Sequence, residues 1–323
     1  MCARPWYVWY SLTTYLEQGP LHLRSLVLNF SKKTVKSQIH ADIDPGTSPL
    51  TVGIVGGLGR MGVWFAKFLK GAGFPILISD LHTELSSEDL ARKCRVLILS
   101  LPMEVFPKEV AKLGPLIPES SFMTDLCSLK QSQVACMLEH TRCEIAGTHP
   151  LFGPAEDSIK EKRVALCPGR GKKWFTWWEG LLRQHGAVTS VVSSEEHDRS
   201  MAWAQALNHF ILLCLGKTLD KHGMDLQRTL ALAPPSFEQQ MNIVARLYHQ
   251  DPELYATIQM SNPYTNSVLE TFSQYGEDLR KIIREGDRSS FIEFFEEVQD
   301  LGRTILENSL ATEDGAKRHV VLL

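Results

Sequence analysis

Hydrophobic positions between residues 49 and 192 form short runs that alternate with longer amphipathic segments. The short runs have strand length, and we predict strands at residues 51–55, 75–79, 96–99, 121–124, 144–146, 163–167 and 187–192. Helical periodicity predicts helices at residues 61–71, 87–93, 104–112, 129–139 and 173–185. Such alternation indicates a parallel sheet with helices on both faces.

The pattern changes at Ser193. Ser193 and Glu196 have the spacing of a capping box, which opens a helix. Almost everything after them has helical periodicity, and we predict helices at residues 196–222, 226–232, 237–249, 252–261, 266–285 and 288–309. The predicted fold class is therefore α/β: a Rossmann-type domain, the kind that binds dinucleotides, followed by an all-helical domain. In the helical domain we expect the dimerisation and substrate contacts that are argued below.

These patterns divide the chain into four parts. Residues 1–48 form an N-terminal extension and linker, 49–192 the NAD-binding domain, 193–310 the helical domain and 311–323 a C-terminal tail. The extension is rich in aromatic residues and lacks the pattern of a secretory signal. It is either an additional helix that docks elsewhere or sequence upstream of the first domain, and we assign it no chemistry.

Composition excludes several classes of function. The formal net charge of −3 gives no basic surface for nucleic acid or anionic lipid. The seven cysteines contain no Cys-x-x-Cys pair, so we expect buried free thiols in a reducing cytoplasm rather than disulfides or a metal site. The most apolar stretch, residues 210–215, is too short to cross a bilayer.

A glycine-rich segment predicts a nucleotide site. Gly57, Gly59 and Gly62 fit GxGxxG between a predicted strand and a predicted helix. The first glycine allows the tight turn, the second lets the backbone approach a pyrophosphate, and the third lets the helix pack on the strand. Asp80, at the end of the next strand, is suited to bind the ribose hydroxyls of NAD and to repel a 2′-phosphate. The alternative is an ordinary strand–helix turn.

Two neighbouring segments complete the predicted cofactor site. Arg60 and Met61 lie at the start of the helix, whose unpaired N–H groups attract a diphosphate. A later strand ends at residues that would face the other edge of the cofactor: Ser100, Leu101 and Pro102.

His149 is the candidate base. It lies in the segment THPLFGP, residues 148–154, which we interpret as a loop bounded by proline and glycine. An unperturbed histidine has a pKa near 6.5, which suits it to accept a proton when an alcohol is oxidised beside a nicotinamide. The alternative is a loop histidine with a satisfied backbone contact.

Five motifs now occur in order: GGLGRMG, DLCSLK, THPLFGP, EHDxxMAxxQALxHF, and VARLY followed by DPxLYxxI. Together they resemble the prephenate dehydrogenase family of tyrosine biosynthesis, over roughly residues 50 to 310. The most similar bacterial members are often fused to chorismate mutase, for whose helices residues 1–48 are too few. The chain departs from the family pattern at Glu238, where bacterial members often carry an arginine.

The resemblance implies oxidation of the C4 alcohol of prephenate by hydride transfer to NAD⁺, with loss of CO₂, giving 4-hydroxyphenylpyruvate. It implies that His149 accepts the hydroxyl proton and that Ser128 hydrogen-bonds both this histidine and the substrate hydroxyl. Ser128 is an equally good N-cap for a helix at 129–139. Lys130 we interpret as a solvated residue.

Three residues of the helical part are predicted substrate ligands. Arg246 lies mid-helix among apolar residues, where a buried guanidinium requires an anion. The resemblance places a substrate carboxylate there, for which we favour the side-chain carboxylate; the alternative is a salt bridge to an acid. Gln205 and His209 share a helical face with Met201. The resemblance supports His209 as a ligand, although a histidine on such a face is more often a core residue.

Other functions remain open. Arogenate or amino-prephenate dehydrogenases would use the same mechanism. A β-hydroxyacid dehydrogenase or imine reductase would need a catalytic lysine or acid where this chain has Gln205 and His209, and an NAD sensor would need no base.

The apolar stripe formed by Phe291, Phe294, Phe295, Val298 and Leu301 favours a homodimer. Tyrosine is a possible inhibitor by resemblance.

Overall fold

The computed structural model describes residues 50–313, with side chains up to residue 308. The predicted extension at 1–48, with Cys2, and most of the predicted C-terminal tail lie outside the described residues.

Seven strands form a single sheet in the order β2-β1-β3-β4-β5-β6-β7. Their bounds are Val52–Val55 (β1), Ile76–Ser79 (β2), Val96–Leu99 (β3), Phe122–Asp125 (β4), Glu144–Pro150 (β5), Arg163–Arg170 (β6) and Val188–Val191 (β7). The first five strands are parallel, but β5 and β6 pair antiparallel. The predicted parallel sheet is confirmed, with one antiparallel pair that arises because residues 151–162 join β5 to β6 without a crossover helix.

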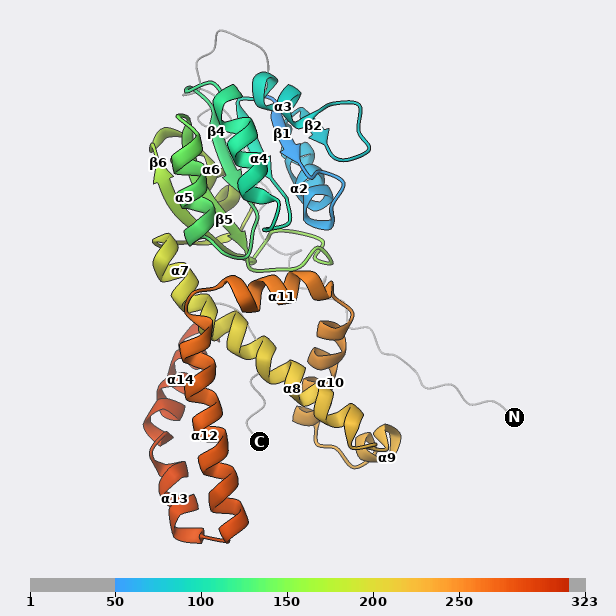
Figure 1. Cartoon of the computed structure of the whole chain (residues 1–323), viewed down its shortest axis with the longest axis vertical. Coiled ribbons are helices and arrows are strands. Elements are labelled where there is room, and N and C mark those ends of the chain that lie inside the picture. Colours follow the sequence, from blue (N-terminus) through green and yellow to red (C-terminus); the bar gives the residue numbers. More distant parts are fainter. Residues whose placement is uncertain (1–49, 314–323) are drawn as a thin grey trace, which may run out of the picture. The chain divides into compact units, whose positions relative to one another are not determined.

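Five helices accompany the sheet: α2 (Arg60–Gly71), α3 (Ser87–Lys93), α4 (Phe106–Leu113), α5 (Gln131–His140) and α6 (Lys173–Gln184). Helices α3, α4 and α5 contribute buried side chains to one apolar cluster, among them Leu90, Phe106 and Val134. The ring of Phe65 in α2 lies against that of Trp178 in α6, with centroids 6.3 Å apart. The helices thus cover both faces of the sheet (Figure 1).

The rest of the described chain is helical. Its elements are α7 (Ser194–Met201), a π-helical turn at Ala202–Leu207, α8 (Asn208–Lys221), α9 (Leu226–Leu230), α10 (Pro235–Tyr248), α11 (Pro252–Ser261), α12 (Thr265–Glu285), α13 (Arg288–Glu296) and α14 (Gln299–Glu313). Ser193 caps α7, accepting a hydrogen bond from the Glu196 N–H at 3.1 Å. The predicted order of a Rossmann-type part and a helical part is confirmed.

Two predicted helices are divided. The helix at 196–222 contains the π turn between α7 and α8, and the helix at 288–309 breaks between α13 and α14. Hydrophobic periodicity continues through both interruptions, so the pattern did not show them.

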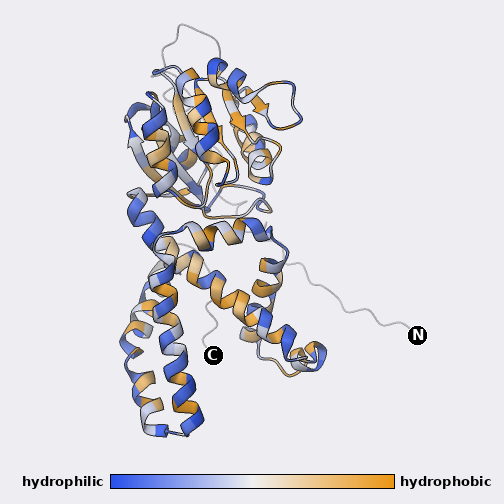
Figure 2. Ribbon diagram, viewed as in Figure 1, coloured by the Kyte–Doolittle hydropathy of each residue, from blue (hydrophilic) through white to orange (hydrophobic). Residues whose placement is uncertain are grey.

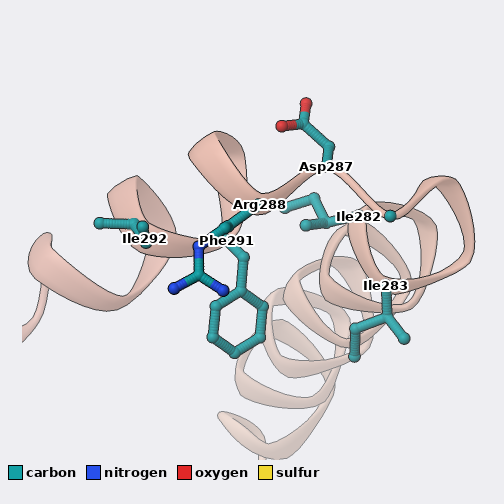
Figure 3. Close-up of a pocket in the computed structure, with 7 residues that line it drawn as sticks. Ile282, Ile283, Asp287, Arg288, Phe291 and Ile292 are labelled. Atoms are coloured by element: carbon teal, nitrogen blue, oxygen red, sulfur yellow. The ribbon is translucent and has the colours of Figure 1, made fainter.

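The predicted apolar stripe is largely exposed on α13 and α14 and between them. Phe295, Val298 and Leu301 are 61%, 56% and 60% exposed, whereas Phe294 is half-buried against Tyr275. Figure 2 shows apolar residues among polar ones along α12 and α13. At the turn joining these helices lies a cavity of about 350 Å³ (Figure 3), lined by Ile282, Ile283, Gly286, Asp287, Arg288, Phe291 and Ile292. It contains none of the predicted site residues.

The cysteines differ partly from expectation. Cys94, Cys127, Cys143 and Cys167 are buried free thiols. Cys136 is half-buried and Cys214 is exposed, because α8 buries only Leu212 completely. No helix within residues 50–313 is long and apolar enough to span a membrane.

Candidate functional site

The glycine-rich turn brings the start of α2 against the ends of β1 and β2. The left-handed residue is Gly56, with φ of 75°, so the tight turn falls one residue before the predicted Gly57. A Cβ on Gly57 would collide with Ile78, and one on Gly62 with the Gly56 carbonyl. At Gly59 a Cβ would meet only the Gly56 oxygen, at 3.2 Å. The side of the turn at Gly59 is therefore open, while the other glycines permit close packing.

The amides at the start of α2 are suited to bind an anion. Gly59 is the N-cap and supplies no side chain to the helix terminus, and the first turn has no acidic residue. The N–H groups of the first helical turn have no helical partner and carry the positive end of the helix dipole. Arg60 and Met61 lie in this turn, and the Arg60 guanidinium donates a hydrogen bond to Gln250 at 3.2 Å. This geometry fits a diphosphate.

Asp80 follows β2 and is fixed beside the turn. Its carboxylate accepts backbone N–H groups of Leu58 at 2.9 Å and Leu81 at 2.8 Å. Each carboxylate oxygen has a second lone pair, so the group retains acceptors for ribose hydroxyls. Ser100, Leu101 and Pro102 follow β3, which neighbours β1 where the strand order reverses. Ligands of open α/β sheets bind at such a switch point.

His149 is a strand residue, and its prediction as a loop residue was wrong. Strand β5 continues to Pro150 because β6 pairs with it, His149 opposite Ala165 and Pro150 opposite Val164. The side chain is buried, with 4% of the residue exposed. Strands β1, β3, β4 and β5 run parallel, so His149 lies at the same sheet edge as the glycine-rich turn.

The ring of His149 is bonded to a second histidine. Its Nδ1 lies 2.9 Å from Nε2 of His197 in α7. The Nδ1 of His197 lies 2.7 Å from Oδ1 of Asp198. All three residues are at least 96% buried, so the hydrogen bonds form out of contact with solvent.

Asp198 also anchors α7 to the beginning of α5. Its two carboxylate oxygens accept the N–H groups of Lys130 at 2.8 Å and of Gln131 at 2.9 Å. Asn262 donates to the Asp198 carbonyl at 2.8 Å. A carboxylate at a helix N-terminus is stabilised by the unpaired amides and the dipole. Asp198 therefore caps α5 from another helix.

Ser128 neither caps α5 nor bonds to His149 within the described residues. Helix α5 begins at Gln131 with Lys130 as its N-cap, so the interpretation of Ser128 as the N-cap was wrong. The cap comes instead from Asp198, which is distant in sequence. Ser128 is half-buried between β4 and α5, and no hydrogen bond joins it to His149 in the part of the chain that the structure describes.

Lys130 is fully buried, so its interpretation as a solvated residue was wrong. Its ammonium group contacts the carboxylate of Asp125, itself fully buried, and donates to the Thr148 carbonyl at 3.1 Å. The Asp125 carboxylate also accepts the N–H groups of Cys127 at 3.0 Å and Thr148 at 3.2 Å. The ion pair therefore joins β4 to β5 immediately before His149.

Burial changes the protonation of His149. Desolvation lowers its pKa well below the usual 6.5, and repulsion from His197, when that ring is protonated, and from Lys130 lowers it further. The imidazole is therefore neutral near pH 7 and can accept a proton.

Gln205 and His209 lie at and after the π turn. Within residues 50–313, Oε1 of Gln205 and Nδ1 of His209 are buried without a hydrogen-bond partner. His209 stacks on Tyr255, with ring centroids 4.4 Å apart, and burial lowers its pKa to about 4. Because buried polar atoms are nearly always paired, these two atoms indicate space for a polar ligand.

Arg246 is exposed, and the expectation of a buried guanidinium was wrong. Helix α10 buries only Val244 and Leu247, which lie on a different face. The guanidinium has no ion pair or hydrogen bond in the part of the molecule that is described, so the alternative of a salt bridge to an acid is not observed there.

Sequence reasoning missed Lys130 and Asp125 as well as the pair His197 and Asp198. Both pairs lay inside motifs quoted above, DLCSLK and EHDxxMA. The signal was the occurrence of charged residues in otherwise apolar surroundings at Asp125 and Lys130.

Two family models match adjoining parts of the chain. The model described as prephenate dehydrogenase, nucleotide-binding domain, matches residues 79–191, and the model described as prephenate dehydrogenase, dimerization domain, matches residues 193–297.

Individual relatives agree with the two family models. A T-protein of Haemophilus influenzae is 32% identical over 271 residues, covering 84% of this chain and 69% of that protein. A probable arogenate/prephenate dehydrogenase of Methanocaldococcus jannaschii is 31% identical over 267 residues, covering 77% of this chain but only 60% of that protein. The crystal structure of prephenate dehydrogenase from A. aeolicus with hydroxyphenyl propionate and NAD⁺ aligns with a TM-score of 0.66 and 23% identity, covering 80% and 99% of the two chains. This last match shows a shared fold.

Proposed function

The chain belongs to the prephenate dehydrogenase family, and we propose that it converts prephenate and NAD⁺ to 4-hydroxyphenylpyruvate, CO₂ and NADH in tyrosine biosynthesis. The observation that carries the proposal is a buried, neutral His149 at the sheet edge that holds the glycine-rich turn. A base at that position is what oxidation of an alcohol beside a nicotinamide requires.

NAD⁺ fits the residues present. The amides of Arg60 to Gly62 would receive the diphosphate, and Asp80 the ribose hydroxyls. The bound nicotinamide would supply the hydride acceptor. Ser100, Leu101 and Pro102 would line the same switch point.

His149 would accept the proton of the C4 hydroxyl. Its Nδ1 is occupied by His197, which leaves Nε2 for the substrate. A general base in this role contributes about 10²- to 10⁴-fold in rate. Ser128 is half-buried and precedes Lys130 by two residues. We propose it as a second ligand of the hydroxyl.

The helical part would bind the rest of the substrate. Oε1 of Gln205 would accept a hydrogen bond from one of its polar groups, and Nδ1 of His209 would accept or donate another. Arg246 would bind a carboxylate, with the side-chain carboxylate favoured because a strong pair with the ring carboxylate would stabilise the charge that decarboxylation removes.

The Arg246→Ala variant is expected to raise KM by about 10- to 150-fold with little change in kcat, because a charged hydrogen bond is worth about 1.5–3 kcal/mol. Steady-state kinetics with saturating NAD⁺ measures both constants. Arg228→Ala, an exposed arginine of α9, is the matched control. An unchanged KM would remove Arg246 from the substrate site.

We propose a homodimer formed through the exposed stripe of α13 and α14, which includes Phe295 and Leu301. Light scattering is expected to give twice the chain mass of 36.4 kDa. Phe295→Glu should shift the protein toward monomer, whereas Val191→Glu, at an exposed apolar position of β7, should not. A monomeric wild type at micromolar concentration would contradict the proposal.

A relative named arogenate/prephenate dehydrogenase favours arogenate as a second candidate substrate. The two substrates share the reacting ring, so His149 would act identically. We also propose inhibition by tyrosine, because tyrosine resembles the product 4-hydroxyphenylpyruvate in shape.

The location that we propose is the cytoplasm. Free cysteines such as Cys143 and Cys167 support a reducing compartment.

The test is NADH formation at 340 nm with prephenate and with arogenate in separate reactions. Turnover with prephenate supports the proposal. Turnover with arogenate alone would keep the mechanism and change the substrate. Absence of turnover with either substrate, despite NAD⁺ binding, would overturn the enzymatic function.

A further inference from the structure

We propose that His197 and Asp198 are positioning residues that hold His149 in the tautomer whose Nε2 carries a lone pair toward the substrate. The inference rests on the proposed role of His149 as base, and it assigns a function to two buried side chains that the reaction itself does not use. It starts from the two consecutive ring contacts, 2.9 Å and 2.7 Å long.

The protons of this chain of bonds can be assigned from Asp198. Its carboxylate accepts two backbone N–H groups at the start of α5, where an ionised acid is favoured. An ionised carboxylate only accepts hydrogen bonds, so the contact at 2.7 Å requires a proton on Nδ1 of His197.

The second contact then follows. A neutral His197 that is protonated on Nδ1 has a bare Nε2, which can only accept. The atom 2.9 Å away, Nδ1 of His149, must therefore be the donor. A neutral His149 with its proton on Nδ1 has its lone pair on Nε2, the form that a general base needs.

The surroundings make this order of protons stable. His197 and Asp198 are 2% and 1% exposed, so water does not compete for the bonds. Asp198 is itself held by α5 and Asn262, which fixes the ring that it supports. Without His197, the His149 ring would be free to adopt either tautomer or to rotate, and only part of the molecules would present a bare Nε2.

Two variants separate this role from general structural support. His197→Leu removes the acceptor, and we expect kcat to fall by about 10-fold or more, but by no more than the 10²- to 10⁴-fold that a general base contributes. The NAD⁺ dissociation constant should stay unchanged. His197→Gln places an amide oxygen that can accept from Nδ1 of His149, and it is expected to recover most of the lost kcat. A leucine variant as active as the wild type, or a glutamine variant as impaired as the leucine one, would overturn the proposal.

A spectroscopic measurement tests the tautomer without substrate. In ¹⁵N-histidine-labelled protein, the signals that disappear in His149→Asn belong to His149. We expect a protonated Nδ1 and a bare Nε2 in the wild type, and a mixture of tautomers in His197→Leu. A wild-type His149 protonated on Nε2 would overturn the proposal.

These results are distinguishable from failure of the proposed function. If His149→Asn keeps full activity, His149 is not the base and the proposed function fails. If His149→Asn is inactive but His197→Leu is fully active, the function stands and only the positioning role is lost.

Discussion

The His149→Asn variant is expected to lower kcat by about 10²- to 10⁴-fold, because it removes the only proton acceptor assigned to the substrate hydroxyl. Asparagine approximates the size of imidazole and keeps an amide that can bond to His197, so β5 and its pairing with β6 should persist. Stopped assays of NADH formation give kcat, and fluorescence titration with NADH shows whether the cofactor still binds.

The matched control is His222→Asn, since His222 is an exposed histidine after α8. It should leave both kcat and cofactor binding unchanged. Turnover of His149→Asn within about 10-fold of the wild type, less than a general base contributes, would show that another group accepts the proton.

The pH dependence of kcat follows from the same residue. His149 must be neutral to act, and its pKa is lowered well below 6.5 by burial first, then by His197 and Lys130. The carboxylates of Asp125 and Asp198, which pair with Lys130 and His197, also face this region. The acid limb of the profile should therefore fall below pH 6.5, and it reports the hydrogen-bonded histidines as a unit.

The stability of the fold should also decrease as the pH falls. His149 binds a proton more readily in the unfolded chain, with a pKa near 6.5, than in the folded one. The unfolded state therefore gains protons first as pH falls, so stability contributed by the buried neutral ring is present above about pH 6.5 and is lost below it.

Local pattern was enough to predict most of the fold. The strand at 96–99 and the helices at 87–93 and 252–261 agree with the structure at both ends. The two helices begin at signals that lie beside them in the sequence: Ser86 and Asp89 form a reciprocal cap for α3, and Asp251 with Pro252 starts α11.

The errors at the site have a common physical origin, which is dependence on residues distant in sequence. His149 is in a strand because β6 pairs with it, and α5 is capped by Asp198, 67 residues after Gln131. Arg246 was expected to be buried because its neighbours are apolar, but the face of a helix that is covered depends on packing partners. Motif resemblance identified the segments, whereas the contacts within them required the structure.

Lys130→Met is expected to lower the free energy of unfolding by about 3–5 kcal/mol, because it leaves the buried carboxylate of Asp125 without its cation. The remaining partners of that carboxylate are the amides of Cys127 and Thr148, which do not neutralise a charge. Chemical denaturation measures the loss directly. In thermal unfolding it corresponds to a decrease of about 6–20 °C in Tm.

Two further variants establish the cause. Lys93→Met breaks an exposed pair with Asp89 and should lower the free energy of unfolding far less than Lys130→Met does, because solvent screens the exposed charges. The double variant with Lys130→Met and Asp125→Asn removes both charges and keeps an oxygen for one of the two amides, so it should recover part of the lost stability. If the double variant is no more stable than Lys130→Met, the loss comes from the packing of the lysine stem against Gly147 rather than from an unpaired charge. The charge on Asp125 is the reason for the expected recovery, since an uncompensated buried charge costs more than the ion pair contributes.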